Sequence, residues 1–250
     1  MIEAFALDIE YRWIHMDGQM QAGAGCFSIP FDVPPYRLSG AVYGTLLNHR
    51  SAVAALGDAV NRPPYDAPPG APVLYIKPRN TLGLSGSVVR IPAGTPELEV
   101  GACLGMVIGR TACRVSEPRA LDYVAGYLIV ADVSIPHSNY YRPSIRFKAR
   151  DGYCPLGPAV TARAAVANPD ALTMRTYLDG ALVQTASTAD LIRPAGRLLA
   201  DVTEFMTLAP GDVLALGAAA PAPRASSVRT VAIEIGGLGS LRIPFMDAAA

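Results

Sequence analysis

Apolar runs bounded by glycine, proline and aspartate predict a chain built mainly of short strands. Each run is rich in Val, Ile, Leu or Tyr, and the turn residues beside it set its ends. The predicted single strands cover residues 41–49, 73–77, 98–108, 127–131 and 213–216. Residues 176–184 predict a hairpin, because Asp179 and Gly180 tolerate the positive φ angles of a type I′ turn. Residues 228–235 and 240–245 predict a second hairpin across a glycine-rich turn.

Helical spacing is confined to a few segments. Ser51 is expected to cap a helix over residues 52–60. Pro118 stands in the first turn of a helix that is expected to end at Gly126. Residues 197–206 repeat apolar side chains at helical spacing. Many strands and few helices indicate an α+β, mainly β fold.

Composition limits the classes of protein to which the chain can belong. Of the 250 residues 51% are hydrophobic, and equal numbers of acidic and basic residues (21 each) give no sign of a nucleic-acid or membrane partner. No apolar run approaches the roughly 20 residues of a spanning helix. The four cysteines are scattered, without a Cys-x-x-Cys pair, so neither a disulfide framework nor a zinc finger is indicated. A cytoplasmic protein is expected, with one domain over residues 41–246 and an irregular segment, residues 1–40, that wraps it.

Candidate chemistry concentrates in residues 122–158. Asp132 directly follows the apolar run 127–131, and four cations at alternate positions come after it: Arg142, Arg146, Lys148 and Arg150. On a strand these cations would share one face and repel each other unless an anion lay between them. An acid at the end of a buried strand, faced by cations, predicts an anion-binding pocket. The alternative is a solvated cationic face beside an aspartate that caps a turn.

Lysine is rare in this chain. Of the 21 basic residues only Lys77 and Lys148 are lysines, and the rest are arginines. A lysine ammonium is compact and its pKa responds to burial, whereas arginine stays charged. Lys77 ends the predicted strand 73–77, and Lys148 lies in the cationic stretch. Both are therefore predicted to face the pocket.

Several blocks of sequence together resemble the fumarylacetoacetate hydrolase family. They are YIKPRNTL (75–82), MVIG (106–109), DYVAGY (122–127) with Asp132, RFKARDG (146–152), TADL (188–191) and EFMTLAPGD (204–212). Within the family, residues 47–51 and 132–136 are most similar to the amino-terminal half, or separate subunit, of the decarboxylase/isomerases of homoprotocatechuate (4-hydroxyphenylacetate) degradation. The resemblance implies the mixed β-sandwich roll of the family's C-terminal domain and assembly as a dimer.

The resemblance also implies a metal site that this sequence only partly retains. Family members bind Mg²⁺ or Mn²⁺ through a Glu-x-Glu pair and an Asp, because hard oxygen ligands hold the ion that stabilises the enolate of a 2-oxo acid. Asp132 occupies the Asp position, but Gly101 and Cys103 stand at the two Glu positions. Glu97 and Glu99 are displaced by four residues, roughly 13 Å along a strand. Metal binding is therefore expected to be weak or absent.

The remaining site residues are likewise implied by the resemblance. The family's general-base histidine falls on Ala52, and His49 is the histidine nearest to that position, either as a catalytic group or as an ordinary strand-end histidine. The predicted catalytic residues are Lys77, Lys148, His49 and Asp132, and the predicted substrate-binding residues are Arg79, Tyr141, Arg146 and Thr188.

Three functions follow from these expectations. The first is a decarboxylase/isomerase that removes CO₂ from 5-oxopent-3-ene-1,2,5-tricarboxylate and isomerises 2-hydroxyhepta-2,4-diene-1,7-dioate, with lysine partly replacing the metal. The second is a non-catalytic subunit of a metal-bearing paralogue. The third is a family member that acts on another carboxylated metabolite. The expected partners are a small carboxylated 2-oxo acid and a second subunit, in a homodimer or in a heteromer with the paralogue.

Overall fold

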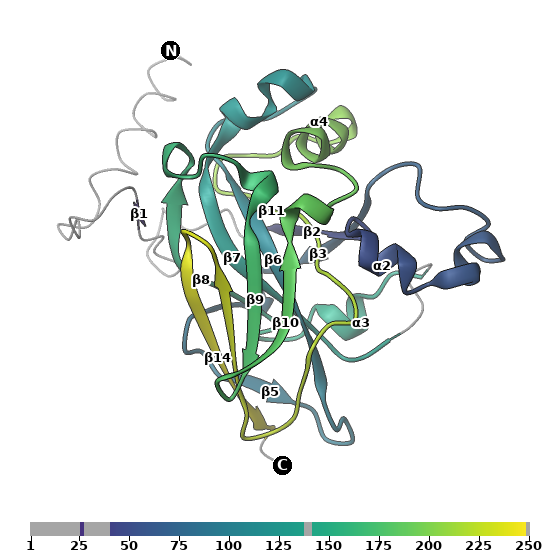
Figure 1. The fold of residues 1–250 in the computed structure, drawn as a ribbon, viewed down its shortest axis with the longest axis vertical. Helices are drawn as coiled ribbons and strands as arrows, with labels where there is room; N and C mark the ends of the chain where they lie inside the picture. Colours follow the sequence, from purple (N-terminus) through teal and green to yellow (C-terminus); the bar gives the residue numbers. More distant parts are fainter. Residues whose placement is uncertain (1–25, 28–40, 138–141, 249–250) are drawn as a thin grey trace.

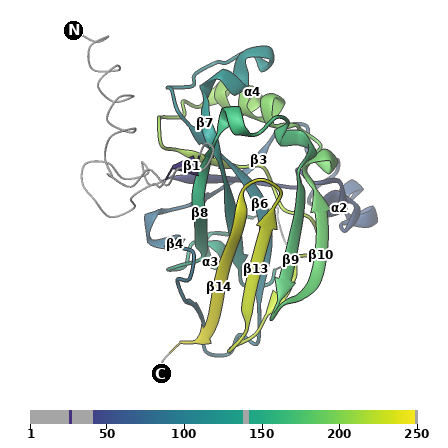
Figure 2. The same cartoon turned by 60° about the vertical axis from the view of Figure 1, so that its left-hand side comes forward.

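Two β-sheets packed face to face form the body of the protein (Figures 1 and 2). The computed structural model describes residues 41–137 and 142–248, together with the backbone of residues 26–27. The expectation that residues 1–40 wrap the domain lies outside the described residues, apart from strand β1, which pairs with β8.

The larger sheet has nine strands, seven of them in the order β1-β8-β7-β6-β11-β2-β3, with β12 paired to β6 and β4 paired to β8. Its strands are β1 (Cys26–Phe27), β2 (Val42–Leu46), β3 (Val73–Lys77), β4 (Leu82–Leu84), β6 (Leu98–Ile108), β7 (Val124–Ser134), β8 (Cys154–Ala162), β11 (Val213–Ala215) and β12 (Arg224–Ala225). Since β3 lies at one end of this order and β4 joins β8 near the other, the chain between them closes the sheet into a roll.

The smaller sheet has five strands in the order β10-β9-β13-β14-β5. They are β5 (Val89–Ile91), β9 (Thr173–Leu178), β10 (Ala181–Ser187), β13 (Thr230–Ile235) and β14 (Gly239–Asp247). Mixed sheets that curl and pack in this way confirm the predicted mainly β roll.

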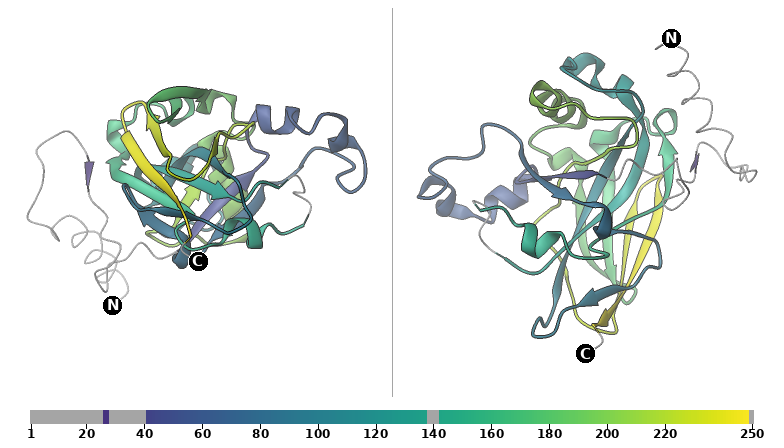
Figure 3. Two further views of the ribbon diagram at one scale, coloured as in Figure 1. Left: turned by 90° about the horizontal axis from the view of Figure 1, so that it is seen from below. Right: turned by 180° about the vertical axis from the view of Figure 1, so that it is seen from behind.

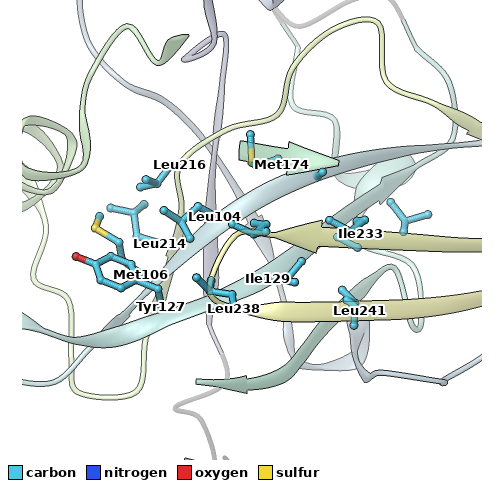
Figure 4. Close-up of a cluster of buried hydrophobic side chains, with 14 of the residues drawn as sticks. Leu104, Met106, Tyr127, Ile129, Met174, Leu214, Leu216, Ile233, Leu238 and Leu241 are labelled. Carbon is cyan, nitrogen blue, oxygen red and sulfur yellow. The ribbon is translucent and has the colours of Figure 1, made fainter. Parts of the chain in front are cut away.

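The main hydrophobic core fills the space between the two sheets. Leu104 and Met106 of β6 point into it, as Figure 4 shows, and meet Ile233 and Leu241 from the smaller sheet. Burying each side chain of this size contributes roughly 1.5–3 kcal/mol. Helix α4 (Ala195–Phe205) contributes Leu198, Leu199 and Val202 to this core. The apolar spacing that predicted the helix is therefore the spacing of its buried side chains.

The opposite face of β6 and β7 carries a second, smaller core. Cys103 and Val107 alternate with the residues of the main core, because successive side chains of a strand point to opposite faces. Val130 of β7 and Leu156 of β8 lie in this smaller cluster. Asp132 lies two residues beyond Val130 on the same strand, so it also faces this side. The larger sheet thus separates the apolar core from the candidate site.

Short helices connect the strands. They are α2 (Arg50–Ala54), η1 (Gly57–Asn61), η2 (Arg79–Thr81), η3 (Glu117–Tyr123), α3 (Ile145–Lys148), η4 (Arg163–Ala165), η5 (Pro169–Ala171) and η6 (Thr188–Asp190). In Figures 1 and 3, α2, η1 and the segment after them project sideways from the sheets. No helix in the described part of the chain is long and apolar enough to cross a membrane.

Several element predictions are confirmed. The predicted strand 98–108 coincides with β6, and strand 73–77 coincides with β3. The hairpin over residues 176–184 is also present, and Asp179 and Gly180 have φ angles of 49° and 85°. These elements carry strong local signals, either an apolar run of the right length or a two-residue turn.

Three predictions in the central stretch are wrong. The helix expected to end at Gly126 is the 3₁₀ helix η3, which gives way to β7 at Val124. Asp132 lies within β7 rather than after its end. The cations do not share a strand face, because residues 145–148 form the single helical turn α3. The backbone amides of Phe147 and Lys148 in this turn donate hydrogen bonds to the carbonyl of Ser144. Ser51 also does not cap its helix, since His49 is the N-cap of α2.

Candidate functional site

A buried carboxylate between two lysine ammonium groups forms the centre of the candidate site. The Lys77 Nζ atom lies 3.0 Å from Oδ1 of Asp132, and the Lys148 Nζ atom lies 2.5 Å from Oδ2. The three side chains come from β3, β7 and α3. The structure therefore brings together three of the residues that the sequence predicted to be catalytic.

The ammonium group of Lys77 donates its hydrogen bonds to backbone carbonyls. Its Nζ atom donates to the carbonyl oxygens of Val133, Lys148 and Tyr153 at 2.6, 2.9 and 2.9 Å. Three acceptors match the three protons of an ammonium group. Burial lowers the pKa of Lys77, and the Asp132 carboxylate opposes this by favouring the charged form. Only 1% of its side chain is exposed. Because the three carbonyls belong to β7, α3 and the residue before β8, Lys77 ties the end of β3 to the far side of the roll.

Lys148 differs from Lys77 in its surroundings. Its Nζ atom donates to Asp132 and lies 4.6 Å from the ring centroid of Tyr75, a cation–π distance. The side chains of Lys148 and Asp132 are 5% and 8% exposed. Both lysine side chains are therefore buried, and Lys148 differs from Lys77 in making no hydrogen bonds to backbone carbonyls among those described.

The cluster carries a net positive charge of one, since two ammonium groups surround one carboxylate. Burial alone would raise the pKa of Asp132, but Lys148 and Lys77 outweigh that effect and hold the pKa of this carboxyl well below its usual range. Burial, reinforced by Asp132, raises the pKa of Tyr75 well above 10. Burial raises the pKa of Cys154 to about 12, despite the nearby Lys77 ammonium. The phenol and the thiol are therefore neutral and leave the positive charge uncompensated.

His49 is held in one tautomer by its contacts with Ser51. Its Nδ1 atom accepts a hydrogen bond from the Ser51 amide (3.2 Å) and lies 2.8 Å from Ser51 Oγ. Since Nδ1 accepts from the Ser51 amide, the ring proton of His49 is on Nε2, and the Ser51 hydroxyl, which itself accepts from the Ala220 amide, donates to Nδ1. Nε2 is buried. Burial lowers the pKa of His49, although the charge of Asp190 and a hydrogen bond to the Ser187 backbone oppose this. The arrangement suits a hydrogen-bond donor better than a general base.

The predicted substrate-binding residues are less concentrated. Arg79 and Arg146 are exposed at the ends of η2 and α3. Thr188 is buried, but its Oγ accepts from the Leu172 amide and faces the Leu172 carbonyl, so it is engaged by the fold. Tyr141 lies outside the described residues. The roles of these residues stay predictions.

Two contributors were absent from the predicted set. Tyr75 covers the Lys148 ammonium, and its ring occupies the space beside Gly44, where a Cβ atom would lie 2.0 Å from the ring. Asn48 bonds through its side chain to both backbone groups of Arg193 and to the Leu216 carbonyl. For Tyr75 the sequence signal is a glycine, Gly44, within an apolar strand. That glycine indicates a close approach but does not identify the ring that fills the space.

Comparison with known proteins places the chain in a family. The model of the fumarylacetoacetate (FAA) hydrolase C-terminal domain matches residues 41–246. The chain belongs to this family. It is 42% identical, over 180 residues, to the 4-hydroxyphenylacetate degradation bifunctional isomerase/decarboxylase of Escherichia coli. That match covers 72% of this chain but 41% of the relative, so the chain spans about two fifths of the curated relatives' length.

Solved structures of the family share the fold. The 5-carboxymethyl-2-hydroxymuconate delta-isomerase of Mycobacterium smegmatis superposes with a TM-score of 0.73 at 27% identity, over 85% of this chain and 81% of that one. Fumarylpyruvate hydrolase of Pseudomonas aeruginosa, in a complex with Mn²⁺ and pyruvate, gives a TM-score of 0.71 over 83% of this chain and 90% of that one. At 22% identity the second likeness shows the fold alone.

The residues of this chain do not fit the divalent metal that the family implies. Gly101 lies directly opposite Asp132 on the neighbouring strand and offers no ligand atom on a side chain. Glu99 lies opposite Ser134 instead, and its carboxylate pairs with Arg224 at 3.2 Å. Among the described residues no three His, Cys, Asp or Glu side chains gather as a metal site would require. Both carboxylate oxygens of Asp132 already face ammonium groups.

Proposed function

We propose that this chain binds a small carboxylated 2-oxo acid and acts on it as a decarboxylase/isomerase. The observation that carries the proposal is the buried cluster of Asp132, Lys77 and Lys148 with its net positive charge. A buried charge without a counter-ion is costly, and an anionic ligand at Lys148 would compensate it. The names of the E. coli and M. smegmatis relatives supply the reaction class.

In this proposal Lys148 stabilises the charge that develops during decarboxylation. When the carbon–carbon bond to the leaving carboxylate breaks, its electron pair moves into the conjugated system and onto the 2-oxo oxygen, and CO₂ departs. The Lys148 ammonium donates to the resulting enolate oxygen, while Asp132 fixes the direction of that ammonium. In isomerisation the 2-hydroxydiene loses its enol proton to water to give the same dienolate, which then takes a proton from water at carbon. Lys77 positions Asp132 and does not contact the substrate.

The substrates that we assign are 5-oxopent-3-ene-1,2,5-tricarboxylate for decarboxylation and 2-hydroxyhepta-2,4-diene-1,7-dioate for isomerisation. Both carry several carboxylates, and the exposed guanidinium groups of Arg79 and Arg146 would bind those remote from the reacting carbon.

One observation favours a second candidate function, that of a partner subunit. The chain spans 41% of the E. coli relative's length, and Gly101 and Cys103 stand where the resemblance implies metal-binding glutamates. A chain of this kind could pair with a metal-bearing paralogue and contribute surface rather than chemistry. In that case the carboxylated substrate would react in the paralogue.

The test is turnover by the purified chain alone. CO₂ release from the tricarboxylate, abolished in Lys148→Met and retained in Arg90→Met, would support the enzyme. Arg90 is a suitable control because it is an exposed cation on β5, in the other sheet. Turnover that appears only when a metal-bearing paralogue is added, and that survives Lys148→Met, would support the partner subunit. If neither preparation turns over, both functions are refuted.

A further inference from the structure

The two carboxylate oxygens of Asp132 are each matched to one ammonium group, and this arrangement has a consequence for metal binding. We propose that Lys148 and a divalent cation are mutually exclusive occupants of Asp132, so that this chain binds its carboxylate ligand through the Lys148 ammonium in a metal-free site. The inference takes from the proposed function only the chemical class of the ligand, an anionic 2-oxo acid or its enolate.

The first argument comes from Oδ2 of Asp132. It accepts a charge-assisted hydrogen bond from Lys148 Nζ. A metal ion at Oδ2 would have to displace this ammonium group. Lys148 would then lose its only anionic partner among the described residues while the ion added two more positive charges nearby. Like charges in a buried region repel strongly, so displacement is unfavourable.

The second argument comes from Oδ1. The nearest cation is Lys77 at 3.0 Å, and three backbone carbonyls hold that ammonium in place. Lys77 cannot move away without leaving those carbonyls unsatisfied in the interior. Oδ1 accepts no well-aligned hydrogen bond, yet the fixed positive charge beside it repels a second cation. Asp132 therefore offers a metal neither of its oxygens.

The third argument is steric. A Cβ atom built on Gly101 would lie 2.8 Å from Cβ of Ala218 and 3.5 Å from Cβ of Asp132. Real Cβ atoms do not approach to 2.8 Å, so an acidic side chain at residue 101 needs a shift of the 217–220 segment. A glutamate at residue 101 therefore cannot be accommodated without a movement of Ala218.

Lys148 retains the capacity to bind an anion. One of its three ammonium protons goes to Asp132, and its face toward Tyr75 makes the cation–π contact. A proton remains for a carboxylate or enolate oxygen of the ligand. A planar dianion such as oxalate, which resembles the enolate of a 2-oxo acid, is the appropriate probe.

The test combines calorimetric titration with oxalate and paramagnetic resonance of Mn²⁺, on the full chain dialysed against EDTA. We expect oxalate to bind with EDTA present, and its affinity to fall by about 10- to 100-fold in Lys148→Met, the loss expected for one charge-assisted hydrogen bond. Lys148→Arg should retain most of the affinity, and Arg90→Met should match the unaltered chain. The signal of free Mn²⁺ should not decrease when the chain is added.

Two results would overturn the inference. One is stoichiometric Mn²⁺ binding that is lost in Asp132→Asn, together with oxalate binding that requires the metal. The other is failure of oxalate to bind with or without Mn²⁺. Circular dichroism of Lys148→Met establishes that the variant is folded, and Lys148→Arg keeps the comparison decisive if it is not. Metal-free oxalate binding without turnover would refute the proposed function and leave this inference standing, whereas turnover that requires Mn²⁺ would do the reverse.

Discussion

Replacing Lys77 by methionine should destabilise the protein far more than the same replacement at Lys148. Methionine keeps much of the length and volume of lysine but removes the ammonium group. At residue 77 the change leaves three backbone carbonyls without their donor and removes one of the two cations beside Asp132. At residue 148 it removes a single hydrogen bond and a contact with Tyr75.

The size of the effect follows from these contacts. Breaking a buried ion pair by removing one partner costs about 3–5 kcal/mol, largely through the groups left unpaired. The Tyr153 carbonyl also accepts from the Val133 amide at 3.2 Å, so it keeps one hydrogen bond in Lys77→Met. We therefore expect a loss of about 3–5 kcal/mol at residue 77. Lys148→Met also breaks a buried ion pair, but Lys77 remains beside Asp132 and no backbone carbonyl loses its donor, so we expect a smaller loss of about 1.5–3 kcal/mol, the worth of one hydrogen bond to a charged group.

Urea unfolding followed by circular dichroism measures both losses as changes in the free energy of unfolding. For a chain of this size each kcal/mol also lowers the melting temperature by about 2–4 °C. Arg90→Met serves as the control for loss of one positive charge at an exposed position. The reasoning fails if Lys77→Met stays within about 1 kcal/mol of the unaltered chain, or if Lys148→Met proves the less stable of the two.

Four further outcomes follow from the structure. Gly101→Ala should cost about 1–3 kcal/mol by overpacking against Ala218, and adding Ala218→Gly should restore unfolding stability. Gly180→Ala should cost about 1–2 kcal/mol in the same assay, because φ at this turn residue is 85°. The pKa of Asp132 is lower in the folded than in the unfolded chain, so its stabilisation is complete above the ordinary pKa of 3.8 and is lost as pH falls below it, a dependence that Asp132→Asn should flatten. The pKa of His49 is also lower in the folded than in the unfolded chain, so the free energy of unfolding should fall as pH drops below the ordinary value of 6.5. A His49→Gln variant whose free energy of unfolding depended on pH as steeply as that of the unaltered chain would contradict this.

The strands could be predicted wherever one local signal decided the conformation. Strand β6 is a run of small and apolar residues, apart from Glu99, between turns, and its predicted bounds match the structure. The segment 142–150 had no such signal. Alternating cations fit a strand, but a turn of four residues is too short to show a helical period, and α3 is fixed by the tertiary contacts of Lys148 and by bonds to Ser144. Local pattern therefore failed where tertiary contacts determine the backbone.

The candidate site was predicted in part for a chemical reason. The rarity of lysine identified Lys77 and Lys148, and the apolar run before Asp132 identified the acid. Their different surroundings could not be predicted, because the three carbonyls that surround Lys77 meet only when the roll closes. For the same reason Asp132 was placed at the end of its strand. An aspartate inside a buried strand is unfavourable in isolation, and the two ammonium groups that compensate it come from distant parts of the chain.

The charge of Lys148 distinguishes the enzyme from a purely structural subunit. Lys77 is accounted for by the carbonyls that it joins, and its charge alone would neutralise Asp132. A second buried ammonium adds a desolvation cost that the fold does not require, since methionine at residue 148 could fill the space beside Tyr75. Such a charge is stabilised when an anion binds to it. A subunit that served only as a scaffold would therefore lose in Lys148→Met only the stability that the contact with Asp132 supplies, whereas the proposed enzyme would also lose its ligand and its turnover.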